Sequence, residues 1–86
     1  MKPSLGRIVR YIGKEGAHSP RAAIVTCAQA DVQPDTDLAP LDTAMHVYLW
    51  VFTPGSAGFV ETNIPYDENG APGTWSWPPI LLRRNW

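Results

Sequence analysis

The 86-residue chain contains a single cysteine, Cys27, so it can form no internal disulfide. Disulfides persist mainly in oxidising compartments, and the cysteine content therefore fits a reducing compartment and a fold without a covalent cross-link. No histidine or lysine lies near Cys27 in the sequence. We interpret it as a small buried side chain rather than a reactive thiol, because a thiol is activated by a neighbouring positive charge.

The sequence also lacks the motifs of common enzymes. It has no Gly-x-Ser-x-Gly, no phosphate-binding loop, no dinucleotide fingerprint and no cluster of cysteine and histidine. His18 and His46 have no motif partner, and His46 is interpreted as a structural residue. The four aspartates between residues 31 and 42 do not have the spacing of a calcium loop. We therefore predict a protein that is not an enzyme and that uses no metal and no cofactor.

Long apolar runs and an excess of charge are absent as well. No run approaches the roughly 20 apolar residues of a membrane-spanning helix, and the first residues lack the apolar core of a signal peptide. The sequence predicts no membrane association and no export. Residues 1–21 carry five bases and one acid, whereas residues 22–68 carry seven acids and no base. These segments form a basic patch if they lie apart and cancel if they interleave, and both arrangements remain open.

Proline and glycine are abundant, with nine and seven residues, and they interrupt the chain too often for long helices. Between them the sequence is rich in β-branched and aromatic residues, which favour strands. A chain of this length has room for one small core. We predict one all-β domain over residues 1–86.

The most apolar stretch, Met45 to Phe52, is predicted to be the central strand. Side chains alternate between the two faces of a strand. One face carries Val47, Leu49 and Val51, and the other carries His46, Tyr48, Trp50 and Phe52. Since neither face is polar, both need cover, either from the same domain or from a second copy of the chain. We therefore predict a homo-oligomer, with the three aromatic residues at its interface.

Four further strands are predicted, and turn residues separate them. Their ranges are Gly6–Ile12, Arg21–Ala30, Ala57–Ile64 and Thr74–Trp77. A type II turn is expected at Thr53–Ser56, a tight turn at Asn69–Gly70, and the longest loop at Asp31–Thr43. This pattern predicts a small five-stranded antiparallel barrel of the SH3-like or OB-like kind. An apolar C-terminal arm follows, and its Leu81, Leu82 and Trp86 are expected to pack on the barrel or on a partner.

Aromatic and basic residues near the two ends of the chain suggest a ligand site. In a five-stranded barrel the first and last strands commonly lie side by side, which would bring Arg7 and Arg10 close to Trp75 or Trp77. Aromatic planes beside guanidinium groups suit a nucleotide or nucleic acid. The candidate ligand-binding residues are Arg7, Arg10, Arg21, Tyr66, Trp75 and Trp77. The alternative is that the aromatic residues only fill the core.

Several segments together resemble a set of small hypothetical proteins encoded by tailed bacteriophages and prophages. The segments are Gly6-Arg7-Ile8-Val9, Arg21–Thr26, Val51-Phe52-x-Pro54-Gly55, Val60–Asp67 with Pro65-Tyr66-Asp67 at its end, and Pro72-Gly73-Thr74-Trp75-x-Trp77-Pro78. The last is the most specific. The resemblance covers most of the chain outside Asp31–Thr43 and implies a viral origin, but no catalytic residue.

A viral origin favours a phage accessory protein that binds rather than catalyses. Its expected role is to counter host defence in the host cytoplasm, by sequestering a nucleotide-derived immune signal or by binding nucleic acid. Two alternatives remain open. One is a structural virion component, such as a head decoration or tail accessory protein. The other is a protein that masks a host protein.

Overall fold

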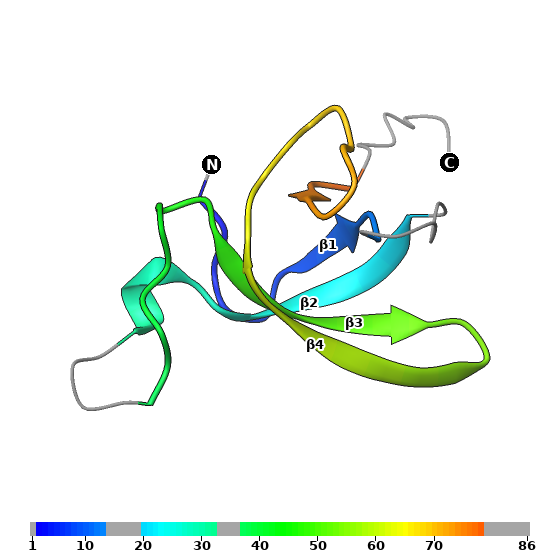
Figure 1. The fold of residues 1–86 in the computed structure, drawn as a ribbon, viewed down its shortest axis with the longest axis horizontal. Coiled ribbons are helices and arrows are strands. Elements are labelled where there is room, and N and C mark those ends of the chain that lie inside the picture. Colours follow the sequence, from blue (N-terminus) through cyan, green and yellow to red (C-terminus); the bar gives the residue numbers. More distant parts are fainter. Residues whose placement is uncertain (1, 14–19, 33–36, 79–86) are drawn as a thin grey trace, which may run out of the picture.

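The chain forms five strands, β1 (Ile8–Tyr11), β2 (Arg21–Cys27), β3 (Val47–Thr53), β4 (Ser56–Ile64) and β5 (Trp75–Ser76). In the computed structural model, which describes residues 2–13, 20–32 and 37–78, these strands make one open sheet in the order β4-β3-β2-β1-β5 (Figure 1). Every neighbouring pair of strands is antiparallel. The prediction of an all-β chain with five antiparallel strands is confirmed.

The prediction that the strand containing Val47 to Phe52 is the central one is wrong. The middle of the sheet is β2, which pairs with β1 on one side and β3 on the other. The tight hairpin between β3 and β4 leaves β4 at one edge, while β1 and β5 extend the sheet beyond β2. The apolar composition of β3 therefore does not report its position in the sheet.

Two predicted strand boundaries move because side chains hold the flanking residues in turns. After β2, the carboxylate of Asp31 accepts the backbone N–H of Ala28 at 2.9 Å, and the chain enters a 3-10 turn, η1 (Gln29–Asp31). Before β3, the hydroxyl of Thr43 accepts the N–H of Met45 at 3.1 Å and hydrogen-bonds His46 Nδ1 at 2.7 Å. His46 is thus a structural residue, as the sequence suggested.

Glycines with positive φ hold two of the predicted turns. The β3–β4 hairpin closes through Thr53 and Ser56, with Gly55 at φ 73° in the position that a type II turn reserves for glycine. In the later turn the N–H of Gly70 donates to the carbonyl of Asp67 at 3.0 Å, and Gly70 has φ 75°. The second turn therefore spans residues 67–70, with Gly70 as its last residue.

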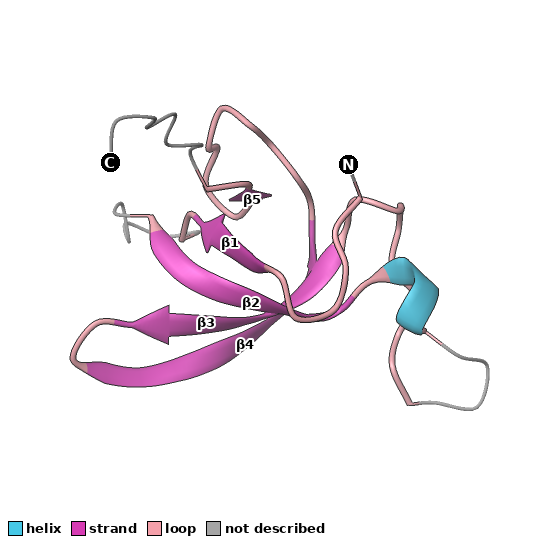
Figure 2. Cartoon of the chain, turned by 180° about the vertical axis from the view of Figure 1, so that it is seen from behind, coloured by secondary structure: helices cyan, strands magenta, loops and turns pink. Residues whose placement is uncertain are grey.

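The sheet is curved (Figures 1 and 2), and the core side chains lie on its inner face. Its buried residues are Val9, Tyr11, Ala23, Val25, Ala28, Val47, Leu49, Val51, Ile64 and Trp75. Cys27 is buried beside them, as predicted, and burial, with the charge of Asp31, raises the pKa of its thiol above its ordinary range. The alternation predicted for β3 is confirmed, since its three aliphatic residues are all buried.

The segment after β4 returns to the opposite edge of the sheet. The N–H of Trp75 donates to the carbonyl of Pro65, and the N–H of Asp67 donates to the carbonyl of Trp75, both at 3.0 Å. On its other side β5 pairs with β1, with Tyr11 opposite Trp75. Figure 1 shows this yellow segment rising from β4 and turning back to the orange β5. Through these backbone bonds, Trp75 connects β5, at one edge of the sheet, with the segment that follows β4, the strand at the opposite edge.

Some predictions concern residues outside the described ranges. The C-terminal arm with Leu81, Leu82 and Trp86 is one of them, and the middle of the Asp31–Thr43 loop is another. Within residues 2–13, 20–32 and 37–78, no helix has the length and apolar character needed to cross a membrane.

Candidate ligand-binding site

The predicted meeting of the first and last strands is confirmed. β1 and β5 pair antiparallel, with Arg10 opposite Ser76 and Tyr11 opposite Trp75. In this register Arg7, which precedes β1, lies near Trp77, which follows β5. The guanidinium carbon of Arg7 lies 5.6 Å from the ring centroid of Trp77, within cation–π range. Arg7 is exposed and Trp77 is half-buried, so the pair forms part of the surface.

The other tryptophan of this strand has a different role. Trp75 has no exposed surface, and its indole N–H donates to the carbonyl of Met45 at 2.7 Å. Tyr66 and Trp77 pack edge-on against it, with ring centroids at 4.9 and 5.0 Å. A buried ring offers no free face to a base, so Trp75 acts here as a core residue, which is the alternative that the sequence left open. Tyr66 supports that core and is half-buried.

The role of the segment from Pro72 to Pro78, Pro-Gly-Thr-Trp-Ser-Trp-Pro, is explained by folding. Gly73 has φ 79°, and its N–H donates to the carbonyl of Ile12 at 2.8 Å. The hydroxyl of Thr74, which is buried, donates to the carbonyl of Ala71 at 2.6 Å. These contacts deliver Trp75 into the core. The segment is therefore a structural element, and of its two tryptophans only Trp77 reaches the surface.

The remaining candidate bases do not join the Arg7–Trp77 pair. Arg21 is opposite Tyr11, at the other end of β1 from Arg7. Its guanidinium carbon lies 5.7 Å from the ring centroid of Phe59, and the group donates to the hydroxyl of Thr53 at 3.3 Å. Arg10 is half-buried on β1 and points to the outer face of the sheet, because Val9 and Tyr11 point to the core.

A polar pair on the inner face was not predicted from the sequence. The hydroxyl of Tyr11 donates to the carboxylate of Glu61, and the ring of Tyr11 packs edge-on against Phe59 at 6.3 Å. Burial raises the pKa of Tyr11 well above 10.0, and the hydrogen bond and charge of Glu61 add to this, while Arg21 opposes it. The sequence places Glu61 and Phe59 on one face of their strand, but it does not show that this face is the inner one.

The chemistry available at this pair is that of a neutral phenol and a carboxylate. Among the described residues there is no group of three or more histidine, cysteine and acidic side chains that could hold a metal ion.

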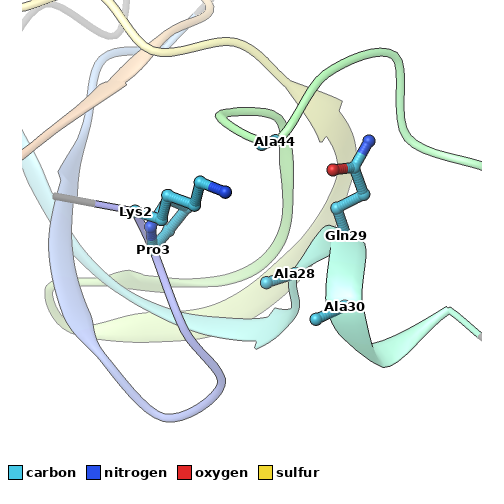
Figure 3. A pocket seen from close by; sticks show the side chains of 6 residues that line it. All are labelled: Lys2, Pro3, Ala28, Gln29, Ala30 and Ala44. Atoms are coloured by element: carbon cyan, nitrogen blue, oxygen red, sulfur yellow. The ribbon is translucent and has the colours of Figure 1, made fainter.

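A small hollow lies between the N-terminal segment and η1 (Figure 3). It has a volume of about 300 Å³ and is lined by Lys2, Pro3, Ala28, Gln29, Ala30 and Ala44. Most of these side chains are small. Its two polar side chains, Lys2 and Gln29, are both exposed and contribute no buried group that would orient a ligand. The hollow follows from the packing of short side chains.

The predicted interface residues of β3 lie on the outer face. Trp50 and Phe52 are exposed, whereas Tyr48 is half-buried and its hydroxyl donates to the carbonyl of Ala39 at 2.8 Å. That bond ties the long loop to β3. Asp42 and Asn63 tie the same loop to the end of β4 through two hydrogen bonds of 3.1 Å.

Comparisons of the chain with protein-family models, with curated proteins and with solved structures find no match.

Proposed function

We propose that this protein is a phage accessory protein that binds a nucleotide-type ligand at the Arg7–Trp77 pair and has no catalytic activity. The observation that carries the proposal is the 5.6 Å contact between the guanidinium group and the indole ring at the surface. Base stacking on an aromatic ring contributes roughly 1–3 kcal/mol, and an arginine contact to phosphate is a strong charge-assisted bond. The pair thus sets an aromatic ring, on which the base would stack, beside a guanidinium group that would bind the phosphate.

The packing beneath the pair also favours binding. Trp75 holds Trp77 edge-on, at an interplanar angle of 88°. A ring whose orientation is already held loses little freedom when a ligand stacks on it, so less of the binding free energy is spent on ordering. The buried tryptophan thus positions the exposed one.

The proposed fold is an SH3-like or OB-like barrel that closes through Trp75. Support comes from the backbone bonds of Trp75 to Pro65 and Asp67 on one side and its pairing with Tyr11 on the other. Barrels of this kind bind ligands through one face and the loops around it. Fold analogy does not choose the ligand. The choice of a host nucleotide signal or nucleic acid, met in the host cytoplasm, rests on the phage resemblance.

The test is a titration of the wild type, Trp77→Ala and Arg7→Ala with cyclic dinucleotides, ADP-ribose derivatives and short single-stranded DNA. We expect the wild type to bind one of these classes and each variant to bind it about 5- to 150-fold more weakly, since a lost stacking or charge-assisted contact is worth about 1–3 kcal/mol. Arg21→Ala is the matched control, because it removes the same charge at the other end of β1. Circular dichroism establishes that each variant is folded.

Two results would contradict the proposal. The first is a wild type that binds none of the three classes. The second is equal weakening by Arg7→Ala and Arg21→Ala with no effect of Trp77→Ala, which would mean that net charge and not a local site attracts the ligand.

A structural virion component is the second candidate, and the exposed apolar side chains of the outer face favour it. Mass spectrometry of purified virions separates the two candidates. A virion component is found in the particle in stoichiometric amount, whereas an accessory protein of the host cytoplasm is absent from it.

A further inference from the structure

Four apolar side chains form a continuous row across the outer face of the sheet. The register sets Ile8 opposite Ile24, Ile24 opposite Trp50, and Trp50 opposite Val60. The row therefore crosses β1, β2, β3 and β4 at one level, and Phe52 lies two residues further along β3. We call Ile8, Ile24, Trp50, Phe52 and Val60 the outer apolar row. Directly opposed side chains on neighbouring strands are in contact distance, so the row is one surface.

This surface is accessible to solvent. The exposed fractions are 63% for Ile8, 38% for Trp50, 45% for Phe52 and 59% for Val60. Fractions of this size leave on the order of 400 Å² of apolar area, about half of what each partner contributes to a standard protein interface. Polar neighbours on the same face, such as Thr26 and Thr62, are exposed as well and extend the area available for contact.

A glycine shapes the middle of the row. A Cβ atom at Gly58 would lie 2.8 Å from the indole ring of Trp50 and 2.5 Å from the carbonyl oxygen of Val51. The ring of Trp50 therefore lies against the backbone of β4 in the space that a side chain would occupy. An aromatic ring over a strand glycine covers the bare backbone.

The described strand positions of the outer face carry almost no charge. They are Ile8, Arg10, Ala22, Ile24, Thr26, Tyr48, Trp50, Phe52, Gly58, Val60, Thr62 and Ser76. Arg10 is the one ionisable base among them, and none of them is an acid. A partner selected by charge would need complementary groups that this face does not offer. A face that meets its own copy needs the opposite property, because any net charge on it would repel its counterpart.

We propose that the outer apolar row docks on the same row of a second copy of this chain, in a two-fold symmetric dimer of sheets packed face to face. A two-fold interface sets one patch against itself, which the near-neutral, apolar surface allows. Sheets that pack in this way interleave their side chains over a separation of about 10 Å. The inference does not depend on nucleotide binding, because Arg7 and Trp77 lie outside the row.

Sedimentation velocity of the wild type and of Val60→Lys at tens of micromolar tests the proposal. We expect a dimer for the wild type and a monomer for Val60→Lys, since the symmetry brings two added charges into one apolar interface. Leu5→Lys is the matched control: Leu5 is 61% exposed but precedes β1 and lies outside the row, so its variant stays dimeric. Ile8→Lys, at the other end of the row, gives an independent second variant.

A monomeric wild type over this range would overturn the proposal, and so would a Val60→Lys or Ile8→Lys protein that is folded and still dimeric. A wild type that is monomeric alone and captured only by a different protein would assign the row to a heterologous partner. Retention of the dimer in Arg7→Ala, together with loss of ligand binding, would separate this inference from the proposed function.

Discussion

The two faces of β3 are both apolar in sequence, yet they have different roles in the structure. Val47, Leu49 and Val51 are fully buried on the inner face, while Trp50 and Phe52 remain exposed on the outer face. The inner residues pack against Trp75 and the rest of the core. The outer residues belong to a row that nothing in the described chain covers. Apolar content alone therefore does not separate the residues that fold the protein from those available for contact.

The two tryptophans at positions 75 and 50 allow this comparison to be measured. The inner one is fully buried with its N–H bonded, and the outer one is exposed on one side. Removing a buried aromatic ring costs about 3–5 kcal/mol, a large part of a small domain's roughly 5–15 kcal/mol. A surface substitution costs much less. We therefore expect a large loss in the free energy of unfolding when the buried tryptophan of the inner face is removed, and a small loss for the exposed tryptophan of the outer face.

Trp75→Ala is expected to give the largest effect. It removes the ring around which Tyr66 and Trp77 pack and leaves the carbonyl of Met45 without its donor. We expect a loss of about 3–5 kcal/mol in the free energy of unfolding, measured by urea denaturation, and partial unfolding at 25 °C. Trp50→Ala is the matched control, with an expected loss of about 1 kcal/mol. Equal losses for the two variants would contradict the assignment of the faces.

Gly58→Ala is expected to have an intermediate effect on the free energy of unfolding. The added methyl group would meet the carbonyl oxygen of Val51 as well as the ring of Trp50. Both the backbone pairing of β3 with β4 and the outer apolar row must therefore shift. We expect a loss of about 1–3 kcal/mol, the usual cost of overpacking, together with a changed Trp50 fluorescence. The control is Thr62→Ala on the same strand. Unchanged stability and fluorescence in Gly58→Ala would show that the ring does not lie over the glycine.

A smaller, pH-dependent effect is expected from the inner face. Because the pKa of Tyr11 is raised in the folded protein, the unfolded chain ionises first above about pH 10, and the free energy of unfolding then falls as pH rises. One such group lowers it by at most about 1.4 kcal/mol per pH unit. Cys27, whose pKa is also raised, adds a similar fall from lower pH.

The measurement is the urea stability of a Cys27→Ala background between pH 8 and pH 11, with and without Tyr11→Phe. In the Tyr11→Phe variant, the free energy of unfolding should fall less as pH rises above about 10 than it does with Tyr11 present. A slope identical in the two proteins would mean that Tyr11 does not contribute to it. Below pH 10 the two proteins should show the same pH dependence, because Tyr11 is protonated in both the folded and the unfolded state.

Local patterns in the sequence were enough to predict most of the strands and turns. Alternation by two assigns residues to faces without knowledge of the partner strand, and it did so correctly for β3. Gly55 indicated the β3–β4 hairpin, because glycine tolerates a positive φ better than other residues do. Strand ends were predicted less well, since the bonds made by Asp31 and Thr43 depend on the exact course of the chain.

The sequence by itself therefore determined the fold class, the two faces of β3, the buried state of Cys27 and the pairing of the first and last strands. Only the tertiary structure decided that β2 is central, that Trp75 is buried while Trp77 reaches the surface, and that Glu61 faces inward to Tyr11. The reason is physical. Alternation along one strand sets which residues share a face, but the face that becomes the inside depends on pairings between residues far apart in the chain.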